Sequence, residues 1–189
     1  MKAAKNLCID IWIVEGTVSR AEALDDVQKA SNMFKKAADA SFCPFYMNWT
    51  TNFHHISAAD WSAKINNGTT TAEAGDDADL RANFAGNAEC VQVWYVHDIA
   101  PLPNGVDPIA LSHPGNGGIT ISDKDDYDDL TLGHELGHQL SGNDVLDSPD
   151  DVGNTQGAKD DGNPMNYDHP GDNFTKAQCD LFKQPPYIK

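Results

Sequence analysis

The sequence predicts a single α/β domain in which helices pack against a twisted sheet of about five strands. Strand-like and helix-like patterns follow one another along the chain, and the strand-like segments are short and rich in Ile, Val and Trp. The composition is globular, with 40% hydrophobic and 8% aromatic residues. A length of 189 residues suits one domain that spans residues 1–189.

The first half of the chain predicts a strand, a long helix, a second strand and a short helix. The expected ranges are Asn6–Val14, Ser19–Ala40, Phe45–Phe53 and Asp79–Phe84, in that order. The long helix backs the sheet and is expected to begin at Ser19, because Ser19 and Glu22 have the spacing of a capping box. Apolar residues then recur at helical spacing from Ala23 onward.

The second half predicts three strands and two helices. The expected strands are Val91–Val96, Ile109–Ser112 and Gly118–Ser122, and the helices run from Ser122 or Asp123 to Ser141 and from Thr175 to Lys183. Pro108 favours an edge position for the strand that follows it, because proline cannot donate to an interior ladder. Five aspartates between 123 and 129 suit the N-terminus of the next helix.

The residues after this helix differ in composition from those before it. A stretch rich in Asp, Gly, Asn and Pro begins near Gly142 and continues to about Asp172, which is typical of functional loops. We therefore expect an N-terminal subdomain over residues 1–142, which carries the sheet, and a small loop-rich C-terminal subdomain over residues 143–189, which ends in a helix.

The charge excludes several classes of partner. The formal net charge is -16, and 24 of the 29 acidic residues are Asp. This surface repels nucleic acid and anionic membranes, and favours neutral or basic polypeptides. The longest apolar run, Leu7–Val14, is interrupted by Asp10 and is too short to span a membrane. The aspartates also offer oxygen ligands, so Ca²⁺ is a candidate cation.

The four cysteines contain no CxxC pair and are widely spaced, at Cys8, Cys43, Cys90 and Cys179. This spacing argues against a cysteine-ligated zinc site. It allows two disulfides in any of three connectivities, or four buried free thiols. Two disulfides would indicate a secreted protein, and the sequence would then be the mature form without its signal peptide.

The sequence His134-Glu135-Leu136-Gly137-His138 carries the strongest chemical signal. Two histidines four residues apart project from one helix face and can bind one Zn²⁺. Glu135 lies about 100° around the helix from His134, so it would stand beside the metal as a general base for a bound water. The sequence thus predicts metal ligands at His134 and His138 and a catalytic residue at Glu135.

A catalytic zinc takes a third protein ligand, which here has several candidates. No glutamate follows Glu135, so a downstream Glu ligand is excluded. The acidic and histidine candidates are Asp144, Asp147, Asp150, Asp151, Asp160, Asp161, Asp168 and His169. Asp144 is favoured because it lies six residues after His138 and just beyond Gly142, where the chain can turn back toward the metal.

With these residues the chain resembles the metzincin family, whose motif is HExxHxxGxxH, or HExxHxxGxxD in the snapalysin-type bacterial proteases. His134, Glu135, His138 and Asp144 fall on matching positions, whereas Ser141 stands at the motif glycine and Gly142 follows one residue late. The resemblance implies a zinc metalloendopeptidase with a mixed sheet, an antiparallel edge strand, a backing helix and an active-site helix.

The resemblance also implies roles for downstream and edge-strand residues. Asn163-Pro164-Met165-Asn166-Tyr167 is similar to the family's Met-turn, with Met165 beneath the metal and Tyr167 as a catalytic residue that stabilises the oxyanion. An extended polypeptide substrate would pair with the edge strand at Ile109, Ala110 and Leu111. We expect the enzyme to act as a monomer.

Two alternatives remain at this point. The chain could be a non-catalytic, secreted, acidic module in which residues 144–161 bind calcium, although that segment lacks EF-hand spacing. It could also resemble an aspzincin protease with a different Asp ligand, although the GTxxDxxYG motif of that family is absent. A protease assay with and without a chelator separates the first alternative from a metalloprotease.

Overall fold

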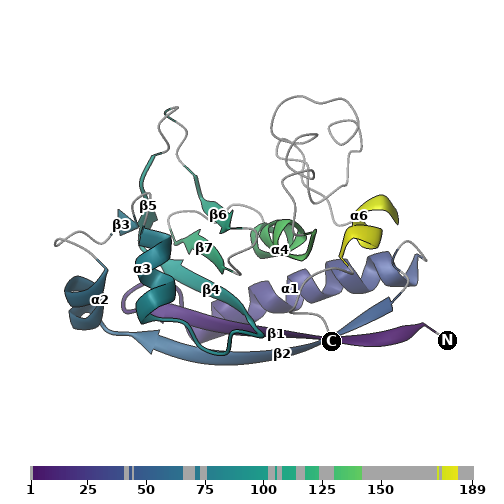
Figure 1. The fold of residues 1–189 in the computed structure, drawn as a ribbon, viewed down its shortest axis with the longest axis horizontal. Helices are drawn as coiled ribbons and strands as arrows, with labels where there is room; N and C mark the ends of the chain where they lie inside the picture. Colours follow the sequence, from purple (N-terminus) through teal and green to yellow (C-terminus); the bar gives the residue numbers. More distant parts are fainter. Residues whose placement is uncertain are drawn as a thin grey trace.

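The computed structural model describes residues 2–40, 43, 45–65, 71–72, 76–101, 105, 108–113, 118–123, 130–141, 174 and 176–182. A five-stranded sheet forms its centre, in the order β2-β1-β4-β7-β6 (Figure 1). The strands are β1 (Ala3–Val14), β2 (Phe45–Ile56), β4 (Val91–Val96), β6 (Ala110–His113) and β7 (Gly118–Ser122). The first three and β7 run parallel, whereas β6 is antiparallel to β7. This confirms the predicted mixed sheet with an antiparallel edge strand.

Helices flank the sheet, and a second, two-stranded sheet lies beside it (Figure 1). The remaining elements are α1 (Arg20–Asp39), α2 (Ala58–Lys64), β3 (Thr71–Ala72), α3 (Asp76–Asn83), β5 (Asp98–Ile99), α4 (Thr131–Ser141) and α6 (Lys176–Leu181). The short strands β3 and β5 are parallel. The backing helix α1 and the final helix α6 agree with the predicted order of elements.

The helix α1 begins at a capping box formed by Ser19 and Glu22. The Ser19 hydroxyl accepts from the Glu22 amide at 3.2 Å, and the Glu22 carboxylate accepts from the Ser19 amide at 2.6 Å. This is the predicted capping box, which satisfies two amides at the helix start. The Ser19 hydrogen bonds also lower the pKa of Glu22. The apolar positions of α1 then face the sheet and α4, among them Ala30, Met33 and Phe34.

The two faces of the sheet carry separate apolar cores. Alternate residues of β1, including Leu7, Ile9 and Ile11, point into a core shared with α1, α4 and α6. On the opposite face Trp94 and Val96 of β4 pack in a core with the side chains of α2 and α3. Because both faces are covered, the central strand β4 is buried along its whole length.

Both disulfides that the cysteine count allowed are present. Cys8 is bonded to Cys90, which ties β1 to the start of β4, and Cys43 is bonded to Cys179, which ties the end of the α1–β2 connection to α6. No cysteine is left free. In the described part of the chain, no helix is long and apolar enough to cross a membrane.

The structure corrects the expected start of the helix that carries the two histidines. This helix, α4, begins at Thr131 and not near Ser122 or Asp123. The Ser122 amide donates to the Ile109 carbonyl at 2.8 Å and the Asp123 amide donates to the Val96 carbonyl at 2.9 Å, so Ser122 ends β7 and Asp123 is still bonded to the sheet. The first turn of α4 contains no acidic residue. The aspartate run therefore does not mark the first turn of α4.

Candidate metal centre

The two motif histidines converge on a single point above α4. The Nε2 atoms of His134 and His138 lie 3.0 Å apart, and their rings meet edge to face with centroids separated by 4.7 Å. Two ligands of a tetrahedral zinc ion with bonds of about 2.0–2.1 Å lie roughly 3.3 Å apart. The observed separation of 3.0 Å is close to this value, so both Nε2 atoms could be ligand atoms of one ion.

Packing of α4 holds this pair in place. Leu132, Leu136 and Leu140 are 0–3% exposed and face the core that α4 shares with α1 and the sheet. The opposing helix comes very close at Gly133, where an added Cβ would lie 2.6 Å from Met33 Cε and 3.5 Å from the Ala30 Cα. The glycine leaves room for the end of the Met33 side chain, which a Cβ at position 133 would overlap.

Glu135 and His138 are both withdrawn from water. Their exposed fractions are 8% and 6%, whereas His134 is half-buried. A carboxylate in such a place interacts more strongly with a nearby charge than one in water. A carboxylate at this position of the helix, one residue after His134, could act as a general base for a water bound near the histidines.

The other predicted site residues of the C-terminal part lie outside the described residues. This applies to Asp144, Met165 and Tyr167, and equally to the other candidates for a third ligand. The described site is thus the His134, Glu135 and His138 group on α4. The identity of the third ligand stays a prediction, as does the division at residue 142.

The predicted substrate strand is found at the edge of the sheet next to α4. Ala110 and Leu111 lie in β6, opposite Ile121 and Thr120 of β7. Ile109 directly precedes the strand, and its carbonyl accepts the Ser122 amide already described. Among the strands that the structure describes, β6 pairs with β7 alone. Its outer edge is where another extended chain could add.

Sequence reasoning missed Gln139, which joins α4 to this edge. Gln139 is 1% exposed, and its side-chain nitrogen donates to the Ser112 hydroxyl at 2.6 Å and to the Gly118 carbonyl at 2.8 Å. The available signal was a long polar side chain directly after the second motif histidine, next to the apolar positions Leu136 and Leu140.

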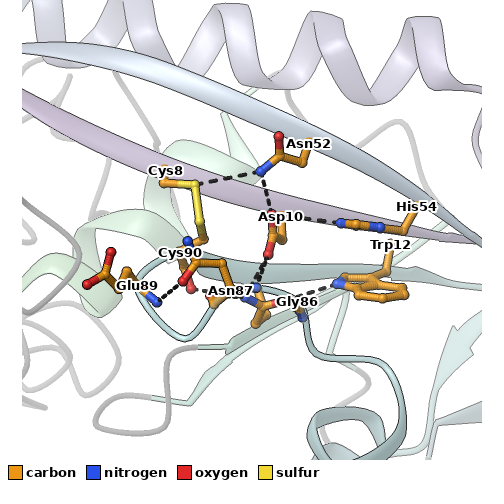
Figure 2. The surroundings of a disulfide bond; sticks show 10 residues. Cys8, Asp10, Trp12, Asn52, His54, Gly86, Asn87, Glu89 and Cys90 are labelled. Carbon is orange, nitrogen blue, oxygen red and sulfur yellow. Dashed lines mark hydrogen bonds and ion pairs between the residues drawn. A yellow bond between two sulfur atoms is a disulfide. The ribbon is translucent and has the colours of Figure 1, made fainter.

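A second group of metal-ligating residues, Cys8, Asp10 and Cys90, lies on the opposite face of the sheet (Figure 2). Their ligand atoms lie within 4.8 Å of one another. The two sulfurs are joined in a disulfide, however, and metals bind the thiolate form of cysteine. This group is therefore a structural one in the oxidised protein.

Asp10 organises this second group by hydrogen bonds. It is 1% exposed, and its carboxylate accepts from the Asn52 side chain at 2.8 Å and from the Asn87 amide at 2.7 Å (Figure 2). The side-chain nitrogen of Gln92 also donates to the Asp10 carboxylate at 3.3 Å, and His54 Nε2 lies 3.8 Å from that carboxylate. These donors satisfy the buried charge and attach β2 and the 84–90 loop to β1.

Comparison with known proteins adds information on the fold. No family model and no curated protein sequence matches the chain. Among solved structures, the chain is similar to archaemetzincin from Methanopyrus kandleri, with 11% identity, 94% of each chain covered and a TM-score of 0.57. It is also similar to archaemetzincin from Archaeoglobus fulgidus complexed with malonate, with 11% identity, 93% of this chain and 99% of that chain covered, and a TM-score of 0.51. At this identity the likeness concerns the fold alone, which the chain shares with these two structures.

Proposed function

We propose that the chain is a zinc-dependent endopeptidase. The observation that carries this proposal is the 3.0 Å approach of His134 Nε2 and His138 Nε2 on a buried helix, with Glu135 between them in sequence. The likeness to two archaemetzincin structures supports it, because the same overall fold surrounds the pair. His134, Glu135, His138 and Asp144 have the spacing of the snapalysin-type motif HExxHxxGxxD, with Ser141 in place of its glycine.

His134, His138 and Asp144 would hold the metal. When bound, zinc supplies a Lewis acid that polarises the scissile carbonyl and acidifies water. Glu135 would take the proton of the attacking water and pass it to the amine that leaves, so the peptide bond breaks with no net change in protons. Tyr167 would donate a hydrogen bond to the oxyanion, and Met165 would pack beneath the site.

The substrate would bind as an extended strand along β6. Backbone groups at Ile109, Ala110 and Leu111 would pair with the peptide, which reads the main chain more than side chains. The net charge of -16 favours neutral or basic polypeptides over acidic ones. We further propose that the protein is secreted and monomeric. The two disulfides agree with an oxidising compartment.

The Glu135→Gln variant tests the assignment. We expect it to keep one zinc per chain, measured by elemental analysis, and to lose about 10²- to 10⁴-fold in turnover of casein. Glu89→Gln, the same change at an exposed turn on the far side of the sheet, is the matched control and should retain activity. Zinc binding without any chelator-sensitive cleavage by the wild type would favour the non-catalytic metal-binding alternative.

A further inference from the structure

Gln139 is a buried polar residue for which the proposed chemistry has no role. It directly follows His138, and only 1% of its surface is exposed. Burial of an amide costs free energy unless hydrogen bonds replace those lost to water. Its position on α4 therefore calls for a function that an apolar side chain could not perform.

The amide of Gln139 binds both strands at the end of the sheet. Its nitrogen donates to Ser112 Oγ in β6 and to the main-chain carbonyl of Gly118 in β7. A carbonyl can only accept, so the nitrogen and not the oxygen of the amide must face Gly118. Both protons of the nitrogen are thereby used, one on each strand.

Gly118 is itself held firmly. It pairs with Gln92 of β4 and with His113 of β6, and an added Cβ would lie 2.8 Å from Trp94 Cη2. The carbonyl of Gly118 is thus a fixed point inside the sheet. Ser112, in contrast, belongs to the edge strand, which in the described part of the chain has β7 as its sole neighbour within the sheet.

We propose that Gln139 is a positioning residue that sets the distance between the edge strand β6 and the His134–His138 pair. This inference rests on the proposed function. A peptide that pairs with β6 must present its scissile bond to groups on α4, and a displacement of about 1 Å can cost on the order of 10²-fold in rate. A single amide that joins α4 to β6 controls that distance directly.

The consequence depends on the length of the substrate. A long peptide forms several main-chain bonds with β6, so its binding depends on where β6 lies. A short peptide touches the strand at few points and is held mainly near the metal. Loss of the Gln139 bridge should therefore reduce the advantage of long peptides over short ones and leave zinc binding unchanged.

Two variants test this, with one control. Gln139→Met keeps the side-chain length and removes the donor, and Ser112→Ala removes only the bond to the edge strand. The control is Gln28→Met, the same substitution at an exposed position of α1. The readouts are zinc content, amide hydrogen exchange of residues 110–113, and kcat/KM for peptides of three to ten residues.

We expect Gln139→Met, which removes both hydrogen bonds, to lower kcat/KM about tenfold for the longest peptides and less than about twofold for the shortest. Ser112→Ala should show the same trend with about a threefold loss. Exchange at residues 110–113 should be faster in both variants but not in Gln28→Met.

Unchanged length dependence in both variants would overturn the inference, and so would a uniform loss on all substrates together with loss of zinc. The wild type is measured first, because a wild-type protein without peptidase activity refutes the proposed function and not the bridge. In that case hydrogen exchange alone decides: equal protection of β6 in Gln139→Met and wild type overturns the bridge.

Discussion

Gly133→Ala is the substitution whose outcome depends most clearly on how α4 packs. In an exposed helix interior this change stabilises by about 1 kcal/mol, because alanine has the higher helix propensity. Here the new Cβ would lie 2.6 Å from Met33 Cε and closer still to its Sδ, and Met33 is 2% exposed. Overpacking of a buried core costs about 1–3 kcal/mol.

The overpacking cost outweighs the gain in helix propensity. The net expectation is a loss of about 0–2 kcal/mol in the free energy of unfolding, with a fall of roughly 2–4 °C in Tm per kcal/mol for a chain of this length. The Ala30 Cα at 3.5 Å is an ordinary contact, so the strain falls on Met33. Urea denaturation of the zinc-free protein measures the change without interference from metal binding.

A double-mutant cycle tests whether the Met33 side chain is the obstacle to a Cβ at position 133. In a Met33→Ala background the obstructing atoms are gone, so Gly133→Ala should stabilise by about 1 kcal/mol. The sign of the effect is thus expected to invert between the two backgrounds. If Gly133→Ala stabilised the wild-type protein by about 1 kcal/mol, the Met33 side chain would not be confined between α1 and α4 as described.

Two further predictions concern buried groups away from the histidines. Asp10→Ala removes the acceptor of the Asn52 side chain and of the Asn87 main-chain amide, whereas the Gln92 side chain keeps its bonds to the Asn87 and Cys90 carbonyls, so we expect it to lower the free energy of unfolding by about 1–3 kcal/mol in urea while zinc content stays the same. A loss below about 1 kcal/mol would show that the network contributes little. Burial raises the pKa of Tyr95 well above 10, and the Asp26 carboxylate, which accepts from the Tyr95 hydroxyl at 2.8 Å, raises it further. The phenol therefore stays neutral in the folded protein at a pH where it ionises in the unfolded chain. Stability should therefore fall as pH rises above 10, and Tyr95→Phe should remove up to about 1.4 kcal/mol per pH unit of that slope; equal slopes would contradict the assignment.

The sequence predicted well those elements whose position depends on residues within the element or directly beside it. The Ser19–Glu22 capping box located the start of α1, and the β-branched run at 91–96 located β4. Pro108 correctly indicated an edge strand, although β6 begins one residue later than expected and ends at His113. In each case a short stretch of chain contains the physical cause of the structure.

Elements that depend on distant contacts were predicted less well. The helix α2 was missed, because its single buried apolar anchor, Trp61, becomes visible only when the core with Phe84 and Trp94 is assembled. The start of α4 was placed too early, because pairing of Ser122 with the sheet overrides the capping preference of the aspartates.

For the candidate site, helical periodicity correctly predicted that His134 and His138 approach each other on α4. Their role as metal ligands and the catalytic role of Glu135 stay predictions. Gln139 was not predicted, because its partners Ser112 and Gly118 lie more than 20 residues away and sequence spacing does not reveal them. The same reason explains why the sequence left three disulfide connectivities open. Pairing of Cys43 with Cys179 spans 136 residues.

The central claim is that two imidazoles of α4 share one zinc ion, and anomalous diffraction at the zinc edge from crystals of the zinc-loaded protein tests it most directly. We expect one anomalous peak about 2.0–2.1 Å from both His134 Nε2 and His138 Nε2. A zinc-loaded crystal with no peak between these two atoms, or with its peak elsewhere on the chain, would contradict the account.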